Sequence, residues 1–322
     1  MSRRFPAGVA TGQMVTDIFE YAKENNFALP AVNVIGSSNA NAVMETAAKL
    51  NSPVIIQFSN GGAGFYAGKG LKTSDAAVLG GISGANHVHT MAAAYGVPVI
   101  LHTDHAAKKL LPWIDGLLEA GAKHFEKTGR PLFTSHMLDL SEEPLEENIE
   151  ICVEYFKKMN ALDMMIEIEL GITGGEEDGV DNSDVDNALL YTQPEEVCYA
   201  HEELSKVGKL FTVAAAFGNV HGVYSAEPKI RFDIIEEVYK EVSVPLVLHG
   251  ASGIGDEDIK KAIQCGIAKI NIHTELCQAA REAINEHKDE PFLGVERAVH
   301  QAVKERAMYK IKLFGDDRRA DE

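Results

Sequence analysis

The sequence predicts an α/β fold, because short apolar runs alternate with helix-length segments along most of the chain. Eight units of this kind follow one another with no linker between them, which is typical of a (β/α)8 TIM barrel. A doubly wound sheet is the alternative arrangement of the same units. The predicted strands lie at about 28–34, 54–59, 97–104, 132–139, 164–170, 210–217, 245–249 and 268–273.

The segment before the first strand predicts a capping helix. Residues 13–25 place Met14, Ile18 and Ala22 on one helical face, and we expect this face to cover the bottom of the barrel. The glycine-rich stretch 61–70 and the acidic stretch 171–187 both follow strands. We interpret them as loops on the face where barrel enzymes carry mobile catalytic segments.

The carboxyl-terminal part predicts a helical extension of the barrel. After residue 274 the apolar spacing becomes helical, including a run at about 294–314. We interpret residues 1–322 as a single domain. Its last residues, about 316–322, read DDRRADE and contain no apolar anchor, so we expect a disordered tail.

Composition and charge exclude several classes of protein. Hydrophobic residues make up 45% of the 322 residues, enough for a large core, but no run reaches the roughly 18 apolar residues of a membrane span. The net charge of −18 argues against a nucleic-acid partner. No apolar segment of a signal peptide follows the amino terminus, and the four cysteines have no CxxC spacing. We therefore expect a cytoplasmic protein with reduced thiols.

Histidines lie at or just beyond three of the predicted strand ends, and these ends would meet at one mouth of a barrel. His105 ends the third strand, His221 follows the sixth, and His249 ends the seventh. Three imidazoles around an open position are the ligand set of a catalytic zinc site. The alternative interpretation makes each of them a core or capping residue. Asp139 and Glu169, at the ends of the fourth and fifth strands, could hold a second metal or orient the ligands.

Two further segments suggest substrate contacts. The stretch 249–255 (HGASGIG) and residues 271–274 place small residues before helix starts, where backbone N–H groups can bind a phosphate. A plain tight turn is the alternative for the first of them. Glu176 and Glu177 lie between glycines, which suits a base on a hinged loop. A solvated acidic loop is the alternative.

These residues lie within blocks that resemble class II, metal-dependent fructose-bisphosphate aldolases. The resemblance extends over nearly the whole chain from about residue 10. Up to about residue 225 it is closest to the longer subgroup, and LVLHGASGI and KINIHTEL then resemble the shorter subgroup, which includes tagatose-bisphosphate aldolases. The main blocks are ALPAVN, QFSNGGA, VILHTDHAAKKLLPWIDG, SHMLDLSEE, EIELGITGGEEDGVDN, LYTQPE and FGNVHGVY.

The resemblance implies a metal site and two proton-transfer residues. Asp104 would be the proton donor in cleavage, acting at the C4 hydroxyl, and Glu177 would move the proton at the carbon of dihydroxyacetone phosphate. The resemblance also implies a second, alternative metal position and a monovalent cation. The zinc ligands it implies are His105, His221 and His249, and the residues of the second position are Asp139 and Glu169.

The resemblance also implies the substrate contacts. Asn33 and Ser59 would contact the aldehyde half, and Arg297 matches the family arginine that reaches the second phosphate from a neighbouring subunit. A homo-oligomer, a dimer or higher, follows from that match. His273 departs from the aspartate of the longer subgroup. The residues that would hold dihydroxyacetone phosphate are Gly222, Gly250, Ala251, Ser252, Asn271, Ile272, His273 and Thr274.

The implied activity is reversible cleavage of fructose 1,6-bisphosphate to dihydroxyacetone phosphate and glyceraldehyde 3-phosphate, with zinc stabilising the enediolate. The expected partners are therefore small phosphorylated sugars, with neither nucleic acid nor membrane. Three alternatives stay open at this point. They are a tagatose-1,6-bisphosphate aldolase, a Schiff-base aldolase that uses Lys269, and a non-catalytic barrel that serves as a scaffold.

Overall fold

The computed structural model describes most of the chain, and the described residues are 4–68, 70–71, 75–171, 174–177, 180–181, 191–218, 220–221 and 230–321. Residues 174–177, 180–181 and 220–221 are described by their backbone alone. Gly222 lies outside these ranges, as does most of the acidic stretch 171–187.

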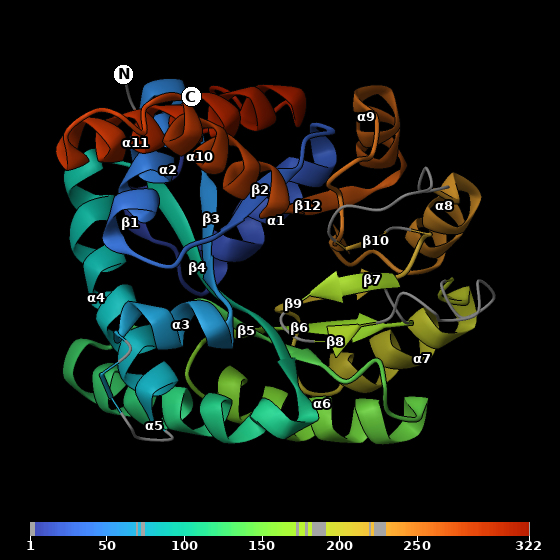
Figure 1. Cartoon of the computed structure of the whole chain (residues 1–322). Helices are drawn as coiled ribbons and strands as arrows, with labels where there is room; N and C mark the ends of the chain where they lie inside the picture. Colours follow the sequence, from blue (N-terminus) through green and yellow to red (C-terminus); the bar gives the residue numbers. More distant parts are fainter. Residues whose placement is uncertain are drawn as a thin grey trace.

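Eight parallel strands form a closed barrel (Figure 1). The hydrogen-bonded order is β4-β3-β2-β12-β11-β9-β6-β5, and pairing of β5 with β4 closes the circle. This confirms the predicted TIM barrel and excludes the doubly wound sheet, which has free edges. The strands are β2 (Leu29–Asn33), β3 (Val54–Phe58), β4 (Pro98–Ala107), β5 (Ser135–Asp139), β6 (Met165–Leu170), β9 (Phe211–Ala215), β11 (Leu246–Leu248) and β12 (Ile267–Ile272).

Helices surround the barrel and continue beyond its last strand (Figure 1). Short strands β1 (Gly8–Val9), β7 (Gly174–Glu177), β8 (Val180–Asp181) and β10 (Val220–His221) lie outside the barrel order. The helices are α1 (Gln13–Glu24), α2 (Ser37–Leu50), α3 (Asn60–Tyr66), α4 (Ala76–Tyr95), α5 (Leu111–Thr128), α6 (Leu145–Asn160), α7 (Pro194–Ser205), α8 (Phe232–Glu241), α9 (Asp256–Cys265), α10 (Thr274–Glu286) and α11 (Phe292–Leu313).

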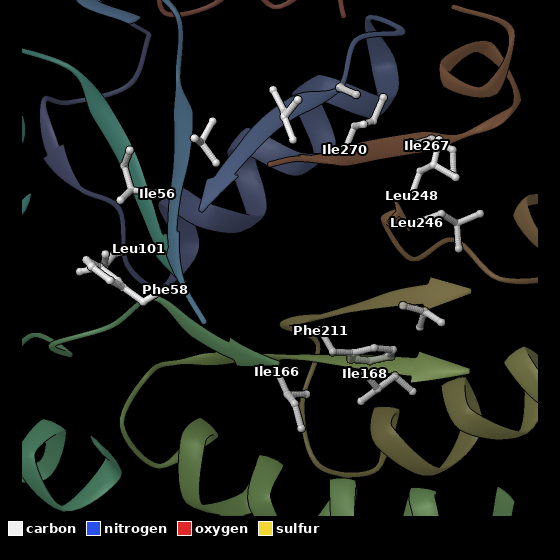
Figure 2. Close-up of a cluster of buried hydrophobic side chains, with 14 of the residues drawn as sticks. Ile56, Phe58, Leu101, Ile166, Ile168, Phe211, Leu246, Leu248, Ile267 and Ile270 are labelled. Atoms are coloured by element: carbon white, nitrogen blue, oxygen red, sulfur yellow. The ribbon is translucent and has the colours of Figure 1, made fainter. Parts of the chain in front are cut away.

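The alternation of side chains along each strand separates two cores. Figure 2 shows apolar side chains on the barrel strands, among them Ile56, Leu101 and Ile168, which belong to the core between sheet and helices. Because successive residues point to opposite faces, the strand neighbours of these residues point into the barrel. The polar residues of the barrel strands therefore lie inside, where they can act together.

The amino-terminal helix closes one end of the barrel, as the sequence predicts. On α1, Val15, Ile18, Phe19 and Ala22 are buried. They form one cluster with inward residues of the strands, of which Ile100 is an example. Each fully buried aliphatic or aromatic side chain of this kind contributes about 1.5–3 kcal/mol to folding. The apolar plug leaves the opposite end of the barrel for polar residues.

The glycine-rich stretch after β3 begins as a helix, so the prediction of a loop there is wrong. Ser59 caps α3 by accepting a hydrogen bond from the backbone N–H of Gly62 at 3.1 Å. The helix lies against α4, where a Cβ at Gly80 would come within 1.8 Å of the Ala63 carbonyl oxygen. Close packing and the cap outweigh the helix cost of about 1 kcal/mol per glycine.

The carboxyl-terminal tail is ordered through Asp321, so the expected disorder is wrong. The N–H groups of Arg318 and Ala320 donate to the carbonyls of Leu50 and Asn51 at 2.7 and 2.8 Å. Ala320 is buried. The N–H of Arg4 also donates to the Ala320 carbonyl at 3.0 Å. A small buried apolar side chain and these backbone hydrogen bonds hold the segment, although its composition is polar. The predicted helical extension is confirmed by α10 and α11.

The tail contains a buried carboxyl group, Asp316, whose oxygens have no hydrogen-bond partner among the described residues. Burial raises the pKa of Asp316 well above its usual range, and Asp317 adds to this shift while Arg319 opposes it. The folded state therefore binds the proton more tightly than the unfolded state. The resulting stability is complete below the pKa of the unfolded chain, about 3.9, and is lost as the pH rises.

We expect Asp316→Asn to be increasingly more stable than the wild type as the pH rises, because the neutral amide carries no charge into this buried site. Urea unfolding at pH 5 and pH 8 measures the difference. Asp17→Asn, at an exposed position on α1, serves as the control and should differ from the wild type by the same amount at both pH values. An Asp316→Asn difference that stays constant between the two pH values would contradict the prediction.

None of the helices in the described ranges combines the length and the apolar character needed to cross a bilayer.

Candidate active site

The carboxyl ends of the barrel strands bring polar side chains to one mouth. Parallel strands in a barrel all point the same way, so their ends converge although they are far apart in the sequence. The group is unusual for a protein interior because its members are polar or charged and all of them are less than 10% exposed. It consists of Asn33, Gln57, His102, Asp104, His105, Glu167, Glu169, His249, Lys269 and Asn271.

A bulge in β4 lets two adjacent residues serve this site. Between Thr103 and Ala106 the register against β5 shifts, so β4 contains one residue more than its partner. Within the bulge, His105 has a φ of +44°, a left-handed conformation that costs about 1–3 kcal/mol for a residue with a side chain. In a regular strand Asp104 and His105 would point to opposite faces. The bulge allows both to contribute to the mouth.

Four of the five predicted metal residues are brought together. The Nδ1 atom of His105 lies 2.9 Å from Oδ2 of Asp139 and 3.3 Å from Oε2 of Glu169. The same Glu169 oxygen lies 3.3 Å from Nδ1 of His249. The two imidazole rings are 4.6 Å apart, centroid to centroid. This places two histidines around one carboxylate at the mouth.

The fifth predicted metal residue, His221, is described by its backbone only. It belongs to β10, which pairs in parallel with β7 so that His221 is opposite Gly175. The same β7 contains Glu177, whose backbone is paired with Val180 of β8. The segments that contain His221 and Glu177 therefore lie side by side beyond the ends of β9 and β6.

The chemistry of the donor set fits a divalent metal ion. In each of two overlapping groups, Asp104–His105–His249 and His105–Asp139–Glu169, the possible ligand atoms lie within 4.8 Å of one another. Imidazole nitrogens and carboxylate oxygens are the ligands that zinc and similar ions accept in catalytic sites. Neighbouring carboxylates also raise the pKa values of the two histidines. Burial alone would lower the pKa of His105, but Asp104 and Glu169 raise it to about 10.

Asp104 is held by amide groups on both of its oxygens. Asn33 donates to Oδ2 at 2.9 Å and Asn271 donates to Oδ1 at 3.0 Å. Gln57 in turn donates to Oδ1 of Asn33 at 2.6 Å. Burial would raise the pKa of Asp104, but His105 and the other nearby cations lower it to about 2. Asp104 is therefore an ionised, rigidly oriented acceptor.

A buried ion pair inside the barrel was not predicted as part of the site. Lys269 Nζ lies 2.7 and 2.8 Å from the two oxygens of Glu167, and both side chains are about 1% exposed. A lysine held in this way is no free nucleophile, which argues against the Schiff-base alternative. The signal for Glu167 was present in the sequence, because it alternates with Glu169 along β6 and must share its face.

Most of the predicted substrate residues that the structure describes follow the ends of barrel strands, where they have different structural roles. Ser59 is used as the cap of α3, and His273 is the residue before α10. Gly250 has a φ of +57° at the end of β11, which favours glycine. Ile272 packs its side chain into the outer core, so only its backbone can contact a substrate. The predicted residues Ala251, Ser252 and Thr274 follow the same strand ends.

A cavity of about 360 Å³ lies beside the mouth, between α2, α10 and α11. Asn33 and His273 line it together with apolar residues of the two carboxyl-terminal helices. Arg297 is exposed on α11 and is not among the residues that line the cavity.

Comparisons with known proteins identify the family to which a barrel with this site belongs. The family model described as fructose-bisphosphate aldolase class-II matches residues 13–319. The fructose-bisphosphate aldolase class 2 of Escherichia coli is 59% identical over 290 residues, 86% of this chain and 81% of that protein. The fructose-bisphosphate aldolase of Haemophilus influenzae is 60% identical over 281 residues, 83% of this chain and 78% of that protein.

Solved structures show the same likeness. The crystal structure of a fructose-bisphosphate aldolase from Campylobacter jejuni superimposes with a TM-score of 0.85 at 44% identity, covering 98% of this chain and 97% of that one. The YdjI aldolase from Escherichia coli gives a TM-score of 0.75 at 36% identity, covering 97% of this chain and all of the other.

Proposed function

Because the chain belongs to the class II fructose-bisphosphate aldolase family, we propose that it catalyses the reversible cleavage of fructose 1,6-bisphosphate to dihydroxyacetone phosphate and glyceraldehyde 3-phosphate. The observation that carries the proposal is the buried cluster at the barrel mouth. There, an oriented carboxylate, Asp104, lies next to two imidazoles and two further carboxylates.

His105 and His249 would hold a zinc ion together with His221, which the resemblance adds, and Asp139 and Glu169 would form a second divalent position. When bound, the ion supplies a Lewis acid for the negative charge that develops on the substrate oxygens. The chain's own contribution is orientation. Asp139 and Glu169 contact Nδ1 of His105 and so fix the direction of its ring.

Asp104 would exchange the proton of the C4 hydroxyl. Because its pKa is lowered to about 2, it is ionised at neutral pH and accepts this proton during cleavage. It returns the proton only in the condensation direction. Cleavage removes the proton of the C4 hydroxyl, so we assign the acceptor role to Asp104 in cleavage and place the donor role, which the resemblance gave for cleavage, in the condensation direction.

The remaining assignments complete the proposal. Asn33 and Ser59 would contact the aldehyde half, and Arg297 would reach the second phosphate in a neighbouring subunit of a homo-oligomer. A monovalent cation would complete the cofactors, as the resemblance implies. All four cysteines are free thiols, which supports a reduced, cytoplasmic setting. The residues that would hold dihydroxyacetone phosphate are Gly222, Gly250 to Ser252 and Asn271 to Thr274.

Metal removal tests the proposal directly. Protein stripped with a chelator should lose cleavage of fructose 1,6-bisphosphate and regain it with Zn²⁺, because without the ion no Lewis acid stabilises the negative charge that develops on the substrate oxygens. Metal content and cleavage rate are measured on the same samples. Full activity after complete metal removal would contradict the proposal, and zinc binding without any cleavage would favour the scaffold alternative.

The stereochemical alternative has one observation in its favour. His273, at the start of α10 and lining the cavity beside the mouth, stands where the longer subgroup has an aspartate. A changed contact there could favour tagatose 1,6-bisphosphate, which differs at C4. Cleavage rates measured for both ketose bisphosphates distinguish the two substrates.

We expect Glu177→Ala to bind zinc and triose phosphate as the wild type does. The rate of proton exchange at the carbon of dihydroxyacetone phosphate should fall by about 10²–10⁴-fold, the usual contribution of one general base. The backbone pairing of β7 with β10 puts the segment of Glu177 next to that of His221. Solvent-deuterium uptake into dihydroxyacetone phosphate measures the step without an aldehyde. Glu176→Ala is the matched control, and wild-type exchange in Glu177→Ala would move the base elsewhere.

A further inference from the structure

Glu167 lies at the centre of a hydrogen-bonded group inside the barrel, next to the cluster of imidazoles and carboxylates at the mouth. Its Oε2 accepts from Thr212 Oγ1 at 2.9 Å, and both of its oxygens contact Lys269. Its Oε1 also lies 3.2 Å from Nε2 of His249. Glu167 thus touches a residue of the cluster without belonging to the ligand set that the sequence predicts.

The two ring nitrogens of His249 face different carboxylates. Nδ1 lies 3.3 Å from Glu169, on the side of the predicted metal position. Nε2 faces Glu167, on the side of the barrel interior. A histidine that binds metal through one nitrogen commonly donates its other N–H to a carboxylate, and this contact fixes the ring tautomer and orientation.

A purely stabilising role does not account for the Glu167–Lys269 pair. Removing two charges from water costs several kcal/mol per ion, and well-packed apolar residues in place of such a pair are often as stable or more stable. Both side chains are about 1% exposed, so the cost applies fully here. The pair therefore calls for a role in the site next to it.

We infer that Glu167, held in place and charge-balanced by Lys269, positions His249 for the metal. The carboxylate accepts the Nε2–H of His249, and the lone pair of Nδ1 is left directed at the cluster. Glu167 and Lys269 are positioning residues, because neither touches the reacting atoms. The inference rests on the proposed function, since it concerns the zinc site of that reaction.

The test uses Glu167→Gln, Lys269→Met and the double variant. Each single substitution leaves a buried charge without its partner and should lower the melting temperature of the metal-free protein. The double variant is again neutral, and it should recover the melting temperature. Its zinc affinity should stay about 10–100-fold weaker than that of the wild type, because the charged acceptor for His249 is still missing.

Zinc affinity is measured by competition between the protein and a chromophoric chelator for Zn²⁺. Glu275→Gln is the matched control, because Glu275 forms another largely buried ion pair, with Lys310 at 2.5 Å, on the carboxyl-terminal helices. The control should bind zinc as the wild type does. Wild-type zinc affinity in the double variant would overturn the inference. Glu167 and Lys269 would then only neutralise each other's charge.

A second measurement needs no variant. In zinc-loaded wild-type protein, the ¹H–¹⁵N spectrum of the histidine rings should show His249 with its proton on Nε2. A proton on Nδ1 would overturn the inference even if the double variant failed to fold. The proposed function fails separately: wild-type protein that binds zinc with this tautomer but cleaves no ketose bisphosphate refutes the reaction and leaves the positioning role standing.

Discussion

Asp104→Ala is expected to keep its fold and its metal while kcat for cleavage falls by about 10²–10⁴-fold, the usual contribution of one general acid or base. The amides of Asn33 and Asn271 hold both oxygens of Asp104, so the wild-type carboxylate meets the substrate already oriented. Alanine removes the proton acceptor and leaves the two histidines of the cluster intact. Cleavage kinetics and metal content of the same preparation measure both effects.

Asp17→Ala provides the matched control for this variant. Asp17 is exposed on α1, at the opposite end of the barrel, so the same substitution there should leave kcat unchanged. If Asp104→Ala turned over at the wild-type rate with zinc bound, the acceptor of the C4 proton would have to be another group.

His249→Ala should have the second large effect, loss of the metal itself. Its Nδ1 is 3.3 Å from Glu169 and its ring is 4.6 Å from that of His105. Removing a ligand should weaken zinc binding by more than the roughly 10–100-fold lost when an outer partner is removed. Cleavage should fall with metal occupancy, and a large excess of Zn²⁺ should restore only part of it.

Equilibrium dialysis against Zn²⁺ measures this loss. His287→Ala is the control, because His287 is partly exposed at the end of α10, where it pairs with Glu290. A His249→Ala protein with full zinc occupancy would remove His249 from the ligand set and would also undercut the role inferred for Glu167.

The barrel was predictable because its signals are local and repeated. Each strand is a short apolar run, and the eight runs agree with the observed strands to within a few residues. The cap formed by α1 was predictable for a similar reason, since its buried face follows a helical period. Topology then placed Asp104, His105 and His249 at one mouth without any knowledge of tertiary contacts.

The features that were missed depend on contacts between distant segments. The glycines after β3 indicate a loop by propensity, and only the approach of α4 at Gly80 makes a helix there favourable. The tail is polar, and its order comes from hydrogen bonds to Leu50 and Asn51. The ion pair of Glu167 and Lys269 joins residues 102 positions apart, which no local pattern shows.

The left-handed backbone at His105 lowers the stability of the fold, but the side chain at this position serves the active site. A glycine there would adopt a φ of +44° at little cost, so it would relieve the strain of about 1–3 kcal/mol. It would also remove an imidazole from the cluster. Selection for thermal stability alone would thus favour the loss of this side chain, and only selection for turnover retains it. For engineering, position 105 is one to leave unchanged, and stabilising substitutions belong among residues that do not face the mouth.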